Sequence, residues 1–319
     1  MKKLLTVLSL GVMSCSLLGL TGCGETLPQI GILQVVTHDA LSSDRQGFID
    51  ELKAEGFEDG KNIKINVQIP EGDSTTEKSM ATNLATNCDM VFGIGTSSSL
   101  ALKNAVSDFD KKTPVLYSAV TDPVGAGLIK SVTDHGNVIG TSDAGPTEKN
   151  IELFTHFTNI DKIGILYNSA EANSIVQKEE CQAACDKFNI TMVDGGITAA
   201  NEISSRLQGM ISSGIKGIVI PTDNTVAAAM SSIKETLISS KVIAVCADAA
   251  ETKNGGALGF SVDYYTLGQT TGKMAAKLLK GDDISSITCS LSDSFPLEIN
   301  EGFFTSTGIA IPEAISSQK

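Results

Sequence analysis

Short apolar segments alternate with amphipathic segments along most of the chain. The clearest unit, residues 217–248, has an apolar run, a polar turn, apolar residues at helical spacing and a second apolar run. This order is typical of a βαβ unit, and its repetition predicts an α/β fold with parallel sheets covered by helices on both faces. We expect strands at residues 29–37, 62–69, 162–167, 191–194, 217–220 and 242–247, and helices at residues 42–55, 74–86, 147–157, 202–213 and 264–279.

The βαβ order occurs twice. Residues 89–122 repeat it, and Thr96 is as far from Asp122 as Thr222 is from Asp248. The repeat favours two doubly wound parallel-sheet lobes, and further extended segments predict a three-strand hinge between them. We expect the crossings near residues 137–142, 257–262 and 284–297, an N-terminal lobe of residues 29–142 plus 258–284, and a C-terminal lobe of residues 143–257 plus 285–319.

The N-terminus has the pattern of an export signal. Lys2 and Lys3 precede an apolar stretch, residues 4–20, which is at the short limit for a transmembrane anchor. The following Leu20-Thr21-Gly22-Cys23 resembles the lipobox of bacterial lipoproteins. By that resemblance, residues 1–22 are a signal peptide, Cys23 is lipidated and residues 23–28 are a tether; we expect the rest of the chain to be soluble.

Charge and composition exclude several classes of function. A formal charge of −13 argues against a nucleic-acid partner, because such a surface repels phosphate. No phosphate-binding loop, zinc-protease motif or nucleophile elbow is present, so we expect neither an enzyme, a cofactor nor a metal site. Five cysteines follow Cys23, an odd number that argues against a disulfide framework. Cys181 and Cys185 share a helical face and are expected to be small apolar side chains, with a metal or redox pair as the alternative.

Polar residues stand where parallel strands end and helices begin. Thr96 and Ser97 could accept a carboxylate at a helix N-terminus, although such residues are more often N-caps. Asp122, Asp223 and Asp248 could bind an ammonium group, although strand-end aspartates are also ordinary caps. The combination predicts a cleft for a zwitterion. Tyr117, Tyr167, Phe260 and Tyr264 could wall the cleft, but aromatic residues at such positions are more often packing residues.

Several segments together resemble ABC-transporter substrate-binding lipoproteins of the type I periplasmic-binding fold, in the group associated with tryptophan and other aromatic amino acids. The most specific are residues 119–127 (AVTDPVGAG) and 221–226 (PTDNTV), supported by residues 31–34, 166–174 and 267–275. The resemblance covers nearly the whole chain after the signal. It implies that the ligand is lined by Gln34, His38, Thr96, Ser97, Thr121, Asp122, Glu171, Asn173, Ser174, Thr222, Asp223, Asn224 and Asp248.

The resemblance also implies a role. We expect a monomeric receptor, lipid-anchored on the outer face of the cell membrane, that captures tryptophan, tyrosine or phenylalanine and delivers it to a permease powered by a cytoplasmic ATPase. The alternatives are a receptor for a non-aromatic solute and a sensor or surface-interaction lipoprotein of the same fold. An enzyme using Asp122 and Asp248 is less favoured, because a nucleophile and a metal motif are missing. A transcriptional regulator would need a basic N-terminal DNA-binding segment where this chain has an export signal.

Overall fold

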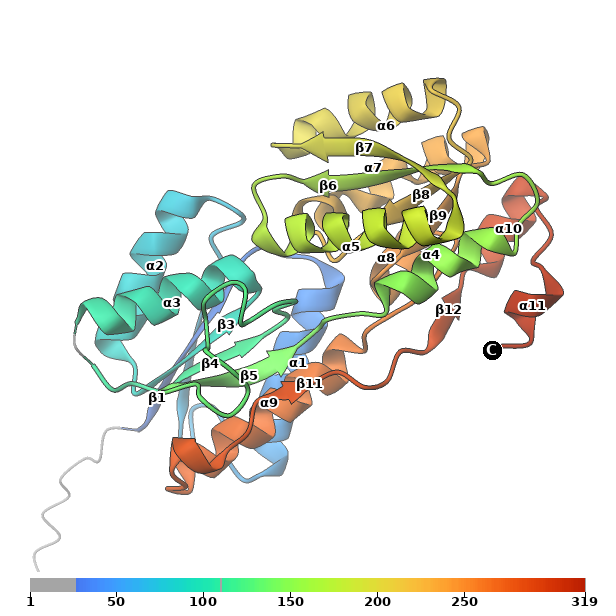
Figure 1. Cartoon of the computed structure of the whole chain (residues 1–319). Helices are drawn as coiled ribbons and strands as arrows, with labels where there is room; N and C mark the ends of the chain where they lie inside the picture. Colours follow the sequence, from blue (N-terminus) through green and yellow to red (C-terminus); the bar gives the residue numbers. More distant parts are fainter. Residues whose placement is uncertain (1–26, 110, 319) are drawn as a thin grey trace, which may run out of the picture.

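The computed structural model describes residues 27–109 and 111–318, and Figure 1 shows them as two lobes side by side. Each lobe is built on one six-stranded sheet. The expected signal peptide and Cys23 lie outside the described residues. Within the described part, no helix combines the length and the apolar composition needed to cross a membrane.

The first lobe has the strand order β11-β5-β4-β3-β1-β2, and all of its pairings are parallel. Helices α2 and α3 cover one face of this sheet and α1 and α9 cover the other (Figure 1). Its elements are β1 (Gln29–Gln34), α1 (Asp39–Ala54), β2 (Lys64–Gln68), α2 (Ser74–Asn87), β3 (Met90–Ile94), α3 (Thr96–Asp108), β4 (Val115–Ser118), β5 (Val138–Ser142), α9 (Tyr264–Leu279), the short helix η2 (Ile284–Ser286) and β11 (Ser290–Leu291).

The second lobe repeats the arrangement with the order β12-β10-β9-β8-β6-β7, in which only the described pairing of β10 with β12 is antiparallel. Its elements are α4 (Thr147–Thr155), β6 (Lys162–Asn168), α5 (Ala172–Phe188), β7 (Thr191–Ile197), η1 (Ala200–Glu202), α6 (Ile203–Ser212), β8 (Gly217–Ile220), α7 (Asn224–Ser240), β9 (Ile243–Cys246), α8 (Ala249–Asn254), β10 (Leu258–Phe260), β12 (Leu297–Ile299), α10 (Glu301–Thr307) and α11 (Glu313–Ser316).

Each lobe has its own hydrophobic core. In the first, the rings of Phe48 and Phe92 stack at 4.2 Å between α1 and β3. Helices α1 and α9 approach closely because a glycine stands on each, and a Cβ at Gly47 or Gly268 would overlap the backbone of the facing helix. In the second core, Cys181 and Cys185 are free and buried, as expected of small apolar side chains.

The chain passes between the lobes three times, but later than the sequence suggests. Residues 138–142 are strand β5 of the first sheet, so the first crossing follows Ser142. The second follows Phe260, because β10 pairs with β9 and β12 in the second sheet. The third follows Leu291, because β11 pairs with β5. The expected lobe boundaries at residues 258 and 284 are therefore too early, since residues 258–260 are strand β10 of the second sheet and residues 290–291 are strand β11 of the first.

Candidate functional site

The carboxyl ends of the strands in both lobes face each other, and hydrogen bonds join them directly. The ring of His38, the N-cap of α1, places its Nε2 3.3 Å from Oδ1 of Asn224 at the start of α7. Gln177 on α5 donates through Nε2 to the hydroxyls of Thr121, in the first lobe, and Thr222, in its own. The lobes are therefore closed upon each other.

An enclosed cavity lies between the closed lobes, at the edge where open parallel sheets hold their ligands. Its free volume is about 10 Å³, roughly the space that one water molecule occupies. It is lined from both lobes and the crossings by His38, Leu41, Ala119, Asp143, Asn173, Thr222, Asp223, Asn224, Ala227, Asp248, Glu251 and Tyr264.

Asp143 contributes one carboxylate from the first crossing, directly after β5. Its Oδ1 accepts from the hydroxyl of Thr121 at 3.0 Å, and its Oδ2 accepts from the hydroxyl of Tyr264, the first residue of α9, at 2.8 Å. Burial raises the pKa of Asp143, and the two hydroxyls only partly offset this. The carboxylate is therefore held in place by two hydroxyl groups of the first lobe.

Asp248 and Glu251 contribute two more carboxylates from the first turn of α8. Asp248 is the N-cap and accepts from the backbone N–H of Ala250 at 2.6 Å. Glu251 is 2% exposed, and neither of its carboxylate oxygens has a hydrogen-bond partner among the described residues. Burial raises the pKa of Asp248 to about 7 and that of Glu251 well above its usual range, and their mutual repulsion adds to the pKa of Glu251. Burying a carboxylate without a hydrogen-bond partner costs free energy, so Glu251 favours a cationic partner.

Asp223 is occupied by the protein itself. Its side chain accepts from the backbone N–H groups of Asn168 and Val226 and from the hydroxyl of Ser174. Burial and the nearby Glu171 raise its pKa to about 7, and the hydrogen bonds lower it. Asp223 therefore acts mainly as the cap that fixes the start of α7.

The cavity lining contains no lysine or arginine among the described residues. His38 does not supply a positive charge, because burial lowers its pKa. The described residues also contain no group of three or more His, Cys, Asp or Glu side chains arranged to hold a metal ion. The charge and hydrogen-bonding of the cavity therefore suit an organic cation, such as an ammonium group.

Six of the residues expected at the ligand do line the cavity: His38, Asn173, Thr222, Asp223, Asn224 and Asp248. The other seven do not line it. Thr96 is buried with its hydroxyl unpartnered among the described residues, and Thr121 supports Asp143. Gln34 binds Arg45, Ser97 donates to Glu77, Glu171 accepts from the start of α7, Ser174 supports Asp223, and Asp122 accepts from the N–H of Gly125 within its own turn.

Asp122 and Asp248 differ although their intervals match. After β9 the chain enters a helix, and Asp248 caps it over the cavity. After β4 the chain enters a loop instead, and Asp122 closes a turn in that loop. Thr96 and Thr222 differ as well, because Thr96 begins α3 whereas Thr222 precedes α7. The equal sequence intervals between Thr and Asp in the two βαβ units therefore do not place these residues at equivalent positions in the two lobes.

Sequence reasoning missed Asp143 and Glu251. The signals were present: Asp143 directly follows the extended segment of residues 137–142, and Glu251 stands one helical turn after Asp248. Leu41, Ala119 and Ala227 were missed because small and apolar side chains carry no chemical signal. Ala119 has a left-handed backbone (φ 54°), a conformation that costs energy outside glycine and often occurs at ligand sites.

Of the four aromatic residues considered as cleft walls, Tyr264 alone lines the cavity. Tyr117 is buried in the first core, and Tyr167 donates to Asp194 at 3.3 Å. Phe260 ends β10, where Lys149 lies over its ring. Packing therefore accounts for most of the aromatic side chains near the hinge.

Comparisons with known proteins give the fold and the family. A sequence model of the family described as ABC transporter substrate binding protein matches residues 29–319. A tyrosine-binding protein of Clostridioides difficile is 31% identical and is matched over 94% of this chain and 90% of that protein.

Two solved structures are similar over nearly the whole chain. An ABC domain in complex with L-Trp from Streptococcus pneumonia is 33% identical, has a TM-score of 0.86 and covers 92% of this chain and 98% of its own. The ligand-free, open structure of a substrate binding protein with adhesive properties from Clostridium difficile is 34% identical, has a TM-score of 0.68 and covers 90% and 97%.

These similarities confirm the predicted fold class, two parallel-sheet lobes of the type I periplasmic-binding kind. The family model also spans the segments that carried the resemblance in the sequence. The family consists of solute-binding proteins rather than enzymes, and such proteins work outside the cytoplasm. The chain belongs to the family of ABC transporter substrate-binding proteins.

Proposed function

We propose that this protein captures an aromatic amino acid between its lobes and delivers it to the permease of an ABC importer. One observation supports the amino-acid class most directly: Glu251 is buried in the cavity with both carboxylate oxygens unpartnered, close in sequence to Asp248. A ligand ammonium would supply the hydrogen-bond donors and the positive charge that these carboxylates lack.

The same carboxylates would couple binding to closure. With the lobes closed, Asp143, Asp248 and Glu251 lose water, and burial raises the pKa of each. A cation bound among them offsets that cost only when the lobes are closed, because Asp143 comes from the hinge and the other two from α8. The ligand therefore shifts the population toward the closed state by its differential affinity.

The aromatic class is supported by two relatives, a tyrosine-binding protein and an ABC domain in complex with L-Trp. The apolar wall of the cavity, made by Leu41, Ala119, Ala227 and the ring of Tyr264, offers a surface for a side chain. With about 10 Å³ free, the lobes must separate to admit any amino acid, and the wall must rearrange to seat an aromatic ring.

The surroundings of the receptor are part of the proposal. The lipobox-like Leu20-Thr21-Gly22-Cys23 supports a lipid anchor at Cys23 after cleavage of residues 1–22. The anchor would hold a monomer on the outer face of the cell membrane, next to a permease whose ATPase lies in the cytoplasm. No cofactor is part of this function.

The binding proposal is tested on the soluble form, residues 24–319, by thermal shift with all amino acids, sugars and nucleosides. We expect a rise in melting temperature with tryptophan, tyrosine or phenylalanine. The protein contains no tryptophan, so selectively excited indole fluorescence comes only from the added L-tryptophan, and a rise in its anisotropy measures binding.

Two analogues sharpen the assay. Indole-3-propionate keeps the ring and the carboxylate but lacks the ammonium, whereas tryptamine keeps the ring and the ammonium. Tighter binding of indole-3-propionate than of tryptamine would contradict the carboxylate argument. A response only to sugars, nucleosides or aliphatic amino acids would discard the aromatic class, and no response to the panel would favour the sensor or surface-interaction role.

The anchor is tested by metabolic labelling with an alkyne analogue of palmitate in a bacterial host. Cys23→Ala should abolish labelling and release the protein from membranes, because the lipid would have no attachment site. Cys15→Ala is the matched control and should leave both unchanged, since Cys15 lies inside the expected signal peptide. Labelling that survives in Cys23→Ala would contradict this site of attachment.

A further inference from the structure

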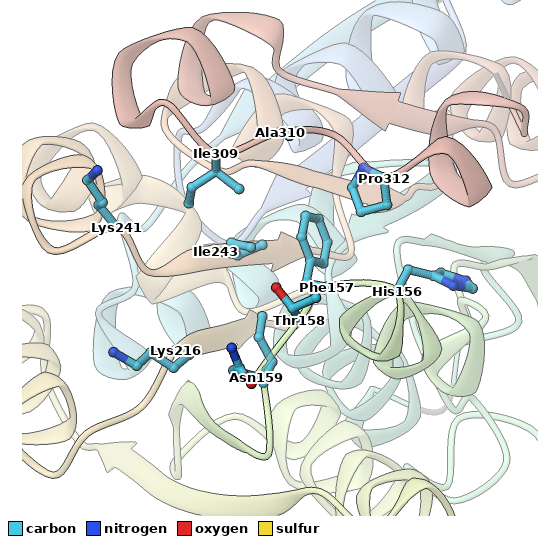
Figure 2. A pocket seen from close by; sticks show the side chains of 11 residues that line it. His156, Phe157, Thr158, Asn159, Lys216, Lys241, Ile243, Ile309, Ala310 and Pro312 are labelled. Atoms are coloured by element: carbon cyan, nitrogen blue, oxygen red, sulfur yellow. The ribbon is translucent and has the colours of Figure 1, made fainter.

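A second cavity, of about 580 Å³, lies at the end of the second lobe opposite the cleft. Its lining includes Ile160, which precedes β6, Lys216, which precedes β8, and Ile243, the first residue of β9. These are the amino ends of the strands, whereas the cleft is at their carboxyl ends. The C-terminal segment between α10 and α11 closes the far side with Ile309, Ala310 and Pro312 (Figure 2).

The floor of this cavity is apolar. Phe157 and Ile243 belong to the core of the second lobe and still border the cavity, and Ile160 and Ile309 pack partly buried against the same core. A concave, mainly apolar site of this volume is of the size that holds a small organic molecule. The remaining lining residues are His156, Thr158, Asn159, Lys216, Lys241, Ala310 and Pro312.

The charged groups of the cavity are all basic. Lys216 and Lys241 lie on the same side, with Ile243 between them, and His156 lies on the other side (Figure 2). No aspartate or glutamate lines the cavity, and neither lysine has an ion pair within the described residues. In a chain with a formal charge of −13, two uncompensated lysines beside an apolar floor favour an anionic occupant.

The backbone holds one of these lysines in place. Lys241 is the C-cap of α7 in the left-handed conformation (φ 53°), and its N–H donates to the carbonyls of Leu237 and Ile238. Asn159, across the cavity from it, also has a left-handed backbone (φ 64°). Two turns with a left-handed residue thus form part of the rim.

We propose that this cavity is a second ligand site, which takes a small organic anion with an apolar body, such as a medium-chain carboxylate. The carboxylate would lie between the ammonium groups of Lys216 and Lys241, and the hydrocarbon would cover Ile243, Phe157 and Ile309. The site is separate from the cleft, because it shares no lining residue with the cavity between the lobes.

The test uses octanoate as the probe and isotope-labelled protein, residues 24–319, with amide chemical shifts as the readout. We expect saturable shifts at residues 156–160, 216, 241–243 and 309–312. Octanamide, which has the same body without the charge, should bind about tenfold more weakly. Shifts confined to the cleft, or equal affinity for octanoate and octanamide, would overturn the proposal.

The variant Lys216→Gln/Lys241→Gln should bind octanoate about five- to tenfold more weakly, because two partly solvated charge contacts are lost. Lys216→Arg/Lys241→Arg should restore binding. The matched control is Lys53→Gln/Lys78→Gln, which makes the same change in charge on exposed residues of the first lobe and should bind as the wild type does.

Circular dichroism melting establishes that each variant is folded. Loss of octanoate binding in the control pair to the same extent would show general charge attraction and refute the site. Amino-acid binding in the cleft is measured on the same variants, and it should be unchanged because the two cavities do not share residues.

Discussion

Replacing Asp248 by asparagine should make the unliganded protein more stable at neutral pH and its ligand affinity weaker. Asp248 is 4% exposed, and burial raises its pKa from 3.8 to about 7. The folded state therefore binds this proton more tightly than the unfolded state does. The contribution of this protonation to the free energy of unfolding is fully present below about pH 4 and is lost as the pH rises through about 7.

The size of the effect follows from the pKa shift. A shift of about three pH units corresponds to roughly 4 kcal/mol in the free energy of unfolding, which is an upper bound for one group. The asparagine side chain in the Asp248→Asn variant would be neutral at every pH, so this contribution to the pH dependence should vanish. Asparagine is also as good an N-cap as aspartate, and the contact with the N–H of Ala250 can persist.

Affinity should change in the opposite direction. Removing a desolvated charge partner of a ligand ammonium costs on the order of 2–5 kcal/mol, which is a loss of roughly 30-fold to 5,000-fold in affinity. Calorimetry with the aromatic amino acid that binds the wild type measures this loss. Urea unfolding at about pH 5 and about pH 8 measures the stability.

Asp122→Asn is the matched control. Asp122 closes a turn outside the cavity, and asparagine can accept the same hydrogen bond from Gly125. We expect neither its stability nor its affinity to change. If Asp248→Asn were no more stable than the wild type at about pH 8 and bound the ligand equally well, both the burial argument and the assignment of Asp248 to the ligand would be refuted.

Four other variants test separate parts of the structure. Gly268→Ala should destabilise the protein by about 1–3 kcal/mol in urea unfolding, because the added Cβ would overlap the backbone of the facing helix. Gly209→Ala should instead stabilise it by up to about 1 kcal/mol, because a Cβ at this position of α6 meets no other atom. Gln177→Ala should lower ligand affinity by about five- to tenfold and raise the radius of gyration of the unliganded protein in X-ray scattering, because it removes the hydrogen bond to Thr121 that joins the two lobes. An unchanged radius would show that Gln177 does not hold the closed state. Ser97→Ala should leave the ligand affinity unchanged in calorimetry, because the hydroxyl of Ser97 already donates to Glu77. A loss of affinity of more than about tenfold would show that Ser97 contacts the ligand.

The elements that sequence predicts best are those whose ends are set by local chemistry. Helix α9 runs from Tyr264 to Leu279 as expected, since Asp263 caps it by accepting from the N–H of Thr266. Helix α1 begins earlier than the expected residue 42, at Asp39, with His38 as N-cap. The N-cap of α1 has no side-chain hydrogen bond to the helix, so no capping signal marks its start.

The site was harder to predict because it depends on contacts between distant segments. Glu251 lies in a cavity that residues of both lobes line, and Asp143 is fixed by Tyr264, far along the chain. Ser97 looked free for a ligand, but Glu77 on the neighbouring helix accepts from it. Local patterns show which residues stand at strand ends, whereas partners from other elements decide which of them remain free.

The packing of α1 against α9 has a consequence for the order in which the lobes can form. The first lobe is completed only by residues 264–291, so α1 cannot pack against α9 until most of the chain is available. The sheet of the second lobe needs only the short β12 from beyond residue 260. Contacts between segments so far apart delay folding. A chain that must cross a membrane before it folds gains from that delay, because the incomplete first lobe stays open until the last quarter of the sequence arrives.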